Sequence, residues 1–328
     1  MKSLPRSNRK TAFLFPGSGA QHLGMGRALR DAFPDIENGL MEINGVLGCD
    51  LASAMDGPPE LLFPPVDSRT PTIFMEVTMA LSLAVARSLA RAGAFPDVLA
   101  GRSMGEYSAA SFGGVFGTGD CFLMVKTVTL YGQEDCLENP SSLVTIYGLS
   151  RMELGKVAEE MSAAGHLCEV VAFYDKPRIG AAGLRNSSLE ELRKRLAPFR
   201  HRISVSKEVG AFHSSLFDRL AGRARGFFSG IPFSPPARPL YMNLDAAPEV
   251  SPDGIKEKLA SALNSPVLWQ ETIRNMLAAG VRTFVEMAPG AMLTEFICDL
   301  PQDAEVLRTD TPEHYKQTMR RLAEKPRA

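Results

Sequence analysis

A serine between two glycines is the first feature of this chain that could do chemistry. Gly101, Ser103 and Gly105 alternate directly after the short apolar segment 98–100 and before an alanine-rich stretch. A strand that turns sharply into a helix through such glycines exposes the serine hydroxyl at the helix N-terminus, as in a nucleophile elbow. The backbone N–H of Met104 would then face the oxyanion of an acyl intermediate. The pattern favours acyl transfer through Ser103, and a glycine-lined turn with an incidental serine is the alternative.

A serine nucleophile needs a general base, and His213 is the best placed candidate. Two other histidines fall in a segment that we expect to form a separate insert, and His314 lies in a polar C-terminal tail. His213 stands where the chain is expected to return from the insert to the main domain. A lone histidine is more often structural than catalytic, but one at a domain junction is a better candidate.

The elements that must position these residues follow from the spacing of apolar side chains. Segment 11–15 reads as a buried strand that ends at a glycine turn, 71–91 as a long buried helix and 98–100 as a short strand. Segment 120–132 is helical in pattern, 283–287 is a strand, and the tail beyond about 306 is a polar helix at best. Strands that alternate with helices predict an α/β fold with a parallel sheet.

Between 142 and 208 the pattern changes to β-α-β-β-α-β. The expected strands are 143–149, 168–173, 178–182 and 202–207, and the expected helices are 151–164 and 188–198. This order is that of a ferredoxin-like unit. We therefore expect residues 142–208 to form a small α+β domain inserted into a large domain made of 1–141 and 209–328.

Composition and charge narrow the functional classes. The 328 residues include 45% hydrophobic and 22% charged residues, as in an ordinary globular protein. With 36 Lys and Arg against 37 Asp and Glu, the net charge of -1 gives no electrostatic basis for binding nucleic acid or an anionic membrane. No apolar run is long enough for a signal peptide or a membrane span. Five widely spaced cysteines without a CxxC pair argue against disulfides and a metal site, and predict a cytoplasmic protein.

Four motifs together resemble one family. Segments 15–21, 101–107, 210–214 and 286–290 occur in the order and spacing of the malonyl-CoA:acyl-carrier-protein transacylases and polyketide-synthase acyltransferases. The resemblance covers roughly residues 11–300. It implies a hydrolase-like α/β core with a ferredoxin-like insert, no bound cofactor, and acyl-CoA or a phosphopantetheinyl carrier protein as substrate.

The same resemblance assigns roles to individual residues. It implies a Ser-His dyad of Ser103 and His213, with the backbone carbonyl of Asn243 orienting the imidazole. The backbone N–H groups of Ser18 and Met104 would form the oxyanion hole. The family's route would make an acyl-serine ester and then pass the acyl group to the phosphopantetheine thiol of an acyl carrier protein, the expected partner.

The chain departs from the family's pattern around the expected acyl pocket. Ser18 and Thr70 stand where the family usually has glutamines, and Arg102 replaces the histidine before the nucleophile. Tyr174 falls near the family's asparagine in the insert. Tyr131 aligns with the arginine that holds the carboxylate of malonyl groups, and a tyrosine cannot supply that charged fork.

These departures predict an acyltransferase for an acyl group other than malonyl, in polyketide or fatty-acid-type biosynthesis. Phe212 completes an acyl pocket expected to consist of Thr70, Arg102, Tyr131, Tyr174 and Phe212. Three alternatives stay open: an editing hydrolase that releases the acyl group to water, a malonyl transacylase that uses Arg102, and a silent carrier-binding protein. Arg102 could also be structural and pair with Glu106.

Overall fold

The computed structural model describes residues 9–62, 73–206, 210–297 and 300–324, which form two sheets with their helices. The larger sheet has the strand order β10-β9-β1-β2-β7-β8. Its strands are β1 (Lys10–Phe15), β2 (Val98–Gly101), β7 (Leu240–Tyr241), β8 (Pro248–Glu249), β9 (Val281–Glu286) and β10 (Glu305–Arg308). All neighbours pair in parallel except β7 and β8.

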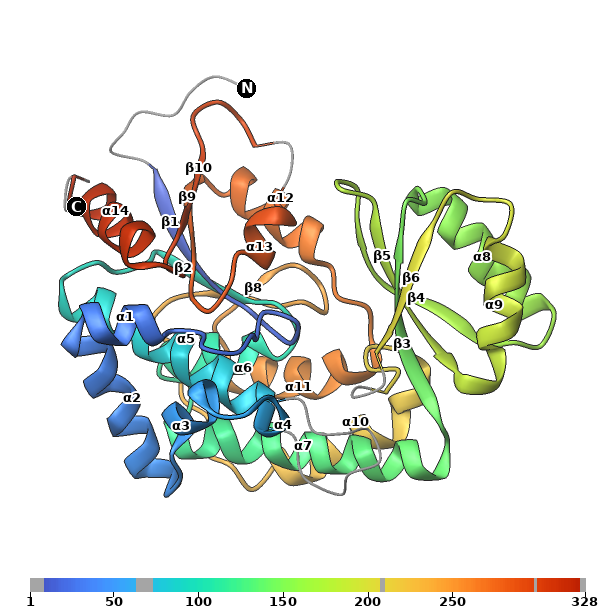
Figure 1. Cartoon of the computed structure of the whole chain (residues 1–328), viewed down its shortest axis with the longest axis horizontal. Helices are drawn as coiled ribbons and strands as arrows, with labels where there is room; N and C mark the ends of the chain where they lie inside the picture. The colour runs from blue at the N-terminus through green and yellow to red at the C-terminus, as the bar shows by residue number, and fades with distance from the viewer. Residues whose placement is uncertain (1–8, 63–72, 207–209, 298–299, 325–328) are drawn as a thin grey trace.

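The smaller sheet is antiparallel, with the order β4-β5-β3-β6. Its strands are β3 (Ser141–Tyr147), β4 (Cys168–Tyr174), β5 (Ile179–Arg185) and β6 (Arg202–Ser206). The larger sheet and its helices form the larger lobe, and the smaller sheet and its helices form the smaller lobe. Helices α8 (Arg151–Ala163) and α9 (Leu189–Leu196) cover the face of the smaller sheet that points away from the larger lobe (Figure 1). They enclose a core of their own with the sheet.

Alternation along β1 explains how the larger sheet is covered on both faces. Phe13 and Phe15 belong to one hydrophobic cluster, and Ala12 and Leu14 belong to another. Successive side chains of a strand point to opposite faces, so both faces of β1 are buried. Helices that contribute to the first cluster include α2 (Pro34–Leu47), α5 (Phe74–Arg91), α6 (Gly105–Phe112) and α10 (Asp218–Phe228), and α12 (Trp269–Ala278) contributes to the second.

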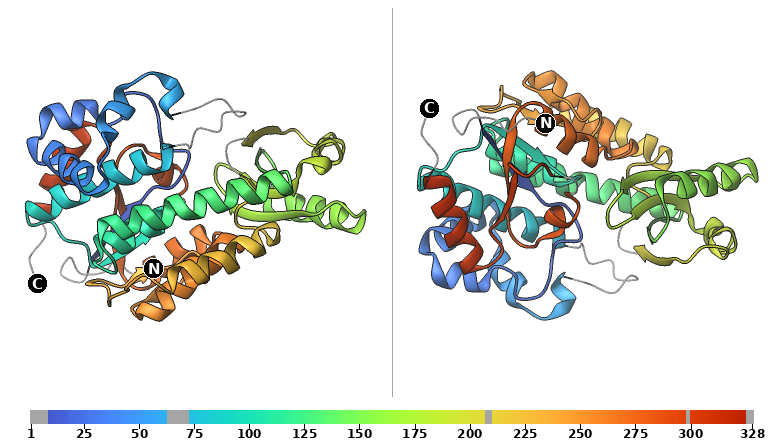
Figure 2. Two further views of the ribbon diagram at one scale, coloured as in Figure 1. Left: turned by 90° about the horizontal axis from the view of Figure 1, so that it is seen from below. Right: turned by 90° about the horizontal axis from the view of Figure 1, so that it is seen from above.

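One long helix joins the two lobes. Helix α7 (Thr118–Glu138) has 21 residues and is therefore about 30 Å long. It starts in the larger lobe, passes beside α10 and leads directly into β3 (Figures 1 and 2). The remaining helices are α1 (Arg27–Ala32), α3 (Leu51–Asp56), α4 (Pro59–Leu62), α11 (Pro252–Ser261), α13 (Met292–Glu295) and α14 (Pro312–Ala323).

The C-terminal tail differs from the sequence expectation. Beyond residue 304 the chain forms the strand β10 at the edge of the larger sheet before the helix α14. This strand has only four residues and begins and ends with a charged one, so its sequence carries no long apolar run. Three of its four side chains are half-buried. The four cysteines in the described part of the chain are free thiols. Within the same residues, no helix is both long and apolar enough to traverse a bilayer.

Candidate active site

Ser103 sits in a strained turn between β2 and α6. Its φ is 54°, in the left-handed region that a non-glycine residue seldom adopts. A Cβ at position 101 would lie 1.9 Å from the carbonyl carbon of Gly105, and one at position 105 would lie 2.1 Å from the carbonyl oxygen of Phe15. The turn therefore needs both glycines, because backbone atoms occupy the space that a side chain would take.

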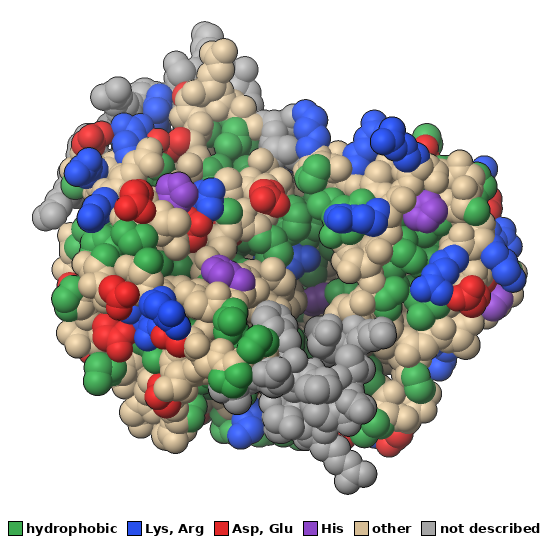
Figure 3. Space-filling view, viewed as in Figure 1, with side chains coloured by type: hydrophobic (Ala, Val, Ile, Leu, Met, Phe, Trp, Pro, Cys, Tyr) green, Lys and Arg blue, Asp and Glu red, His purple; other side chains and the backbone are tan. Residues whose placement is uncertain are grey.

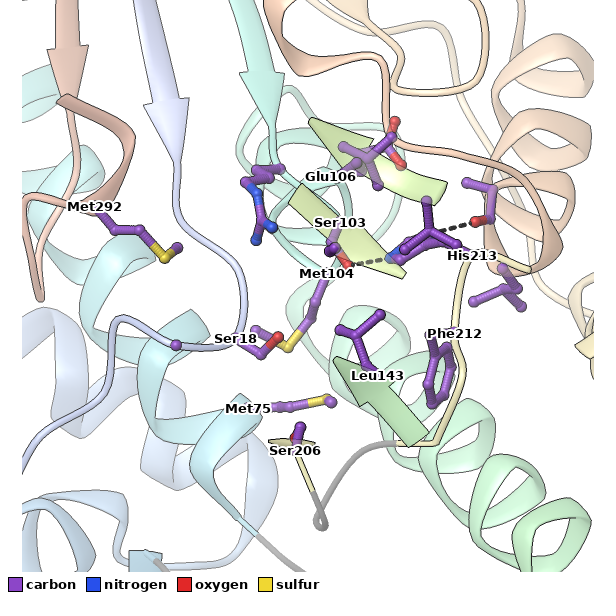
Figure 4. A pocket seen from close by; sticks show the side chains of 18 of the residues that line it. Ser18, Met75, Ser103, Met104, Glu106, Leu143, Ser206, Phe212, His213 and Met292 are labelled. Atoms are coloured by element: carbon purple, nitrogen blue, oxygen red, sulfur yellow. Dashed lines mark hydrogen bonds between the residues drawn. The ribbon is translucent and has the colours of Figure 1, made fainter. Parts of the chain in front are cut away.

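His213 completes a short hydrogen-bonded chain with Ser103. The serine Oγ lies 2.7 Å from Nε2 of His213, and Nδ1 lies 2.6 Å from the carbonyl oxygen of Ala262 (Figure 4). A carbonyl can only accept, so Nδ1 carries the ring proton and Nε2 is free to accept the serine proton. The backbone N–H of His213 donates to the carbonyl of Leu263 at 2.8 Å. Hydrogen bonds to the backbone carbonyls of residues 262 and 263 thus hold the imidazole in position.

The expected role of Asn243 is corrected by this geometry. The carbonyl that holds the imidazole belongs to Ala262, while the carbonyl of Asn243 accepts from the N–H of Leu268. The side chain of Asn243 instead supports the nucleophile turn: Oδ1 accepts from the N–H of Ser103 at 2.7 Å, and Nδ2 donates to the carbonyl of Gly101 at 2.6 Å. Asn243 therefore acts on the serine side of the pair.

Burial keeps the imidazole neutral. Desolvation lowers the pKa of His213 to about 4. The hydrogen bond to the Ala262 carbonyl opposes this shift, and the positive charge of Arg102 lowers the pKa further. A neutral imidazole can take a proton from Ser103 without first losing one. The buried Glu106 carboxyl accepts from the N–H of Asn243, and desolvation raises its pKa to about 8.

The pH dependence of acylation should report this shift. Because the folded pKa of His213 is about 4 instead of 6.5, the imidazole stays neutral as the pH falls below 6.5, and the rate of Ser103 acylation should decline only as the pH approaches 4. The lowered pKa also favours the folded state above pH 6.5, and that contribution is lost as the pH falls through the folded pKa. Single-turnover acylation measured from pH 4 to 8 checks this, with circular dichroism at each pH. An inflection near pH 6.5 in the folded protein contradicts it.

Two backbone N–H groups lie where an oxyanion could form. A Cβ at Gly17 would be 2.4 Å from the carbonyl oxygen of Arg102 and 3.6 Å from the nitrogen of Met104, so the loop after β1 passes against the nucleophile turn. Ser18 and Met104 both line the cavity beside Ser103 (Figure 4). Among the described residues, neither N–H donates to a protein acceptor, which leaves both available to a ligand.

The cavity next to Ser103 lies between the two lobes and has a volume of about 480 Å³. Figure 3 shows it as a hollow with hydrophobic side chains around it and basic and histidine side chains at its floor. The larger lobe contributes Met75, Val125, Val128 and Thr129, and the smaller sheet contributes Leu143, Val171 and Ile179. Phe212 lines it and stacks on Phe217 with ring centroids 4.5 Å apart. The walls are therefore mostly apolar.

Arg102 does not pair with Glu106. Its Nε donates to the hydroxyl of Tyr174, and its guanidinium carbon lies 5.5 Å from the ring centroids of both Tyr174 and Phe296. Those two rings stack on each other with centroids 3.9 Å apart. Arg102 and Tyr174 line the cavity, as expected from the sequence, and Phe296 is a third member that the sequence reasoning missed.

The expectation for Tyr131 is wrong. The guanidinium carbon of Arg223 lies 3.6 Å from the Tyr131 ring centroid, and Tyr131 does not line the cavity. Helix α7 instead presents Val125, Val128 and Thr129 to the cavity, as their spacing of three and four residues allows. The helical periodicity of apolar residues in 120–132 was the available signal. Thr70 lies outside the described residues.

Comparisons with known proteins agree with this architecture. The acyl transferase domain family matches residues 12–309, so the chain belongs to that family and is an acyltransferase. It is 28% identical over 321 residues to the malonyl CoA-acyl carrier protein transacylase of Bacillus subtilis, covering 96% of this chain and 98% of the relative. It is 27% identical to the polyketide biosynthesis malonyl CoA-acyl carrier protein transacylase PksC of the same organism, covering 90% and 98%.

Solved structures show the same fold. The MCAT of Streptococcus pneumoniae superposes with a TM-score of 0.82 at 26% identity, covering 95% of this chain and all of that one. A malonyl-transacylase solved with its type II PKS acyl-carrier protein gives a TM-score of 0.84 at 26% identity, covering 95% and 99%. The α/β architecture with one mostly parallel and one antiparallel sheet is thus that of the transacylase structures.

Proposed function

We propose that this protein transfers an acyl group to an acyl carrier protein through an ester on Ser103. The observation that carries the proposal is the 2.7 Å contact between Ser103 Oγ and Nε2 of His213 at the floor of an apolar cavity. His213 takes the serine proton as the hydroxyl attacks the thioester carbonyl, and returns it to the leaving thiolate. The thiol of the carrier's phosphopantetheine arm then attacks the ester as His213 takes its proton; the bond to Ser103 Oγ breaks, and His213 returns the proton to the serine oxygen. The N–H groups of Ser18 and Met104 stabilise both oxyanions.

The acyl carrier protein as acceptor is supported by the relatives, whose names state that they act on such carriers. The donor is an acyl-CoA or another carrier thioester, and neither chemistry needs a cofactor. We also propose that residues 142–208 form a ferredoxin-like domain inserted in a hydrolase-like domain of 1–141 and 209–328. The strand order β4-β5-β3-β6 supports the first part.

The acyl group that we propose is not malonyl. Helix α7 offers only Val125, Val128 and Thr129 to the cavity, so it supplies no cation for a carboxylate. A carboxylate that points at the α7 wall would be buried among apolar side chains without a paired cation, which costs on the order of several kcal/mol. The cation that does line the cavity, Arg102, lies against Tyr174 and Phe296 and not on this wall. The lining of α7 carries this proposal, since Tyr131 does not line the cavity.

Intact-protein mass spectrometry tests the proposal directly. The pure protein is incubated with a panel of acyl-CoA thioesters, and holo acyl carrier protein is then added. A mass increase equal to one acyl group that disappears when the carrier gains the same mass supports transfer. An adduct that decays into water at the same rate with and without the carrier identifies an editing hydrolase instead. No adduct with any thioester overturns the proposal.

Adding a cation to α7 should change the selectivity. Val128→Arg places a guanidinium in the cavity and is expected to raise malonyl loading relative to butyryl loading on the order of tenfold, because hydrogen bonds to charged groups are the stronger ones. Initial rates of Ser103 labelling from the two CoA esters give the ratio. Leu130→Arg is the matched control, since Leu130 is exposed on the same helix and outside the cavity. An equal ratio in both variants contradicts the role of α7.

A further inference from the structure

Arg102 is a cation in an otherwise uncharged cavity. Of the described residues that line it, three carry a carboxyl, imidazole or guanidinium group: Arg102, Glu106 and His213. Burial favours the neutral forms of the last two, because it raises the pKa of the Glu106 carboxyl and lowers the pKa of the His213 imidazole. Arg102 forms no ion pair with any carboxylate of the described residues, whereas Arg225 and Arg274 on the surface do.

The side chain of Arg102 is nevertheless held in place. Its Nε donates a hydrogen bond to the hydroxyl of Tyr174, and the guanidinium packs near the stacked rings of Tyr174 and Phe296. Its two Nη groups have no acceptor among the described residues. A fixed cation with unused donors beside the nucleophile is pre-organised for a ligand, since little side-chain entropy remains to be lost on binding.

We propose that the guanidinium of Arg102 binds an oxygen atom carried by the acyl chain close to the thioester. The inference rests on the proposed function and names the substrate class of that site: acyl groups with an oxygen at the third carbon, such as 3-hydroxyacyl or 3-oxoacyl groups. Arg102 is the chain neighbour of Ser103 and both side chains line the same cavity, so the first carbons of an acyl group on Ser103 share that cavity with the guanidinium. The apolar walls of Val128, Leu143 and Ile179 suit the rest of the chain.

A malonyl carboxylate presents the same oxygen chemistry to Arg102, and the experiment separates the two sources. Initial rates of Ser103 labelling are measured by intact mass with butyryl-, 3-hydroxybutyryl-, acetoacetyl- and malonyl-CoA. We expect the 3-hydroxybutyryl or the acetoacetyl ester to label the protein on the order of tenfold faster than butyryl-CoA. Faster labelling by malonyl-CoA than by both, dependent on Arg102, would keep the subsite and overturn the non-malonyl part of the proposed function.

Variants assign the preference to Arg102. Arg102→Met should bring the ratio of 3-hydroxybutyryl to butyryl labelling close to one, and Arg102→Lys, which keeps the charge, should retain part of it. Tyr174→Phe keeps the ring and removes the hydroxyl that holds Nε, so it should raise KM for the 3-hydroxybutyryl ester more than it lowers kcat. Arg225→Met, at an exposed ion pair with Glu257, is the matched control and should keep the wild-type ratio.

The outcomes distinguish this inference from the proposed function. If the wild-type protein is labelled by butyryl-CoA as fast as by the oxygenated esters, the subsite is wrong while acyl transfer through Ser103 stands. The same conclusion follows if Arg102→Met and Arg225→Met show equal ratios. If no thioester labels the protein, the proposed function itself fails. The wild-type comparison decides the matter even where a variant does not fold.

Discussion

Ser103→Ala is expected to abolish the acyl-enzyme completely, and acyl transfer to the carrier should fall on the order of 10⁴-fold or more. The hydroxyl is the nucleophile that we propose, and alanine leaves no atom able to form the ester. Intact mass after incubation with an acyl thioester measures the first effect, and carrier acylation measures the second. The Asn243 bond to the backbone N–H of residue 103 is preserved, so the turn should persist.

Ser229→Ala is the matched control for this experiment, because Ser229 is the exposed residue directly after α10 and its hydroxyl donates to the carbonyl of Gly226. It should acquire the acyl mass at the wild-type rate. An adduct of unchanged mass on the Ser103→Ala protein would place the nucleophile elsewhere and remove the elbow from the mechanism.

His213→Ala should slow both acylation of Ser103 and transfer to the carrier by a factor on the order of 10² to 10⁴, the usual contribution of a general base. The loss should be similar for every acyl group, because the ring contacts the serine hydroxyl, whose proton transfer is common to all of them. Rapid-mixing measurements of the two half-reactions separate the effects.

His201→Ala is the corresponding control, since His201 bonds the carbonyl of Phe199 in the smaller lobe. It should keep wild-type rates. Unequal slowing of the two half-reactions in the His213→Ala protein would mean that His213 serves as base in only one of them. Unchanged rates in both would exclude it.

Much of the elements' order could be predicted from the sequence, because apolar periodicity and glycine turns are local signals. The β-α-β-β-α-β order between 141 and 206 follows from that periodicity. The edge strand β10 could not be predicted in the same way. A short edge strand buries little, so its residues Glu305 and Arg308 look like those of a solvated tail.

In the candidate site, too, some features could be predicted from the sequence and others could not. The proximity of Ser103 and His213 could be predicted because four motifs occur in one order. The partner of the imidazole could not, since a backbone carbonyl such as that of Ala262 leaves no trace in the residue type. Tyr131 was misplaced because the motif alignment gives a position in the chain and no direction: two residues after Thr129 is about 200° around the helix, so the side chain leaves the cavity face and packs against Arg223.

The route of α7 places much of the acyl cavity away from the proposed reacting pair. Ser103 and His213 are both anchored in the larger lobe, through the β2 turn and the 262–263 segment. The cavity, in contrast, has one wall on α7 and the facing wall on the strand β3 that α7 leads into. We therefore expect substitutions along this helix and strand to change which acyl group is accepted while the proposed Ser103–His213 pair keeps its geometry. A protein built in this way is expected to change its acyl group by single substitutions in these two elements, each of which leaves the proposed reacting pair in place.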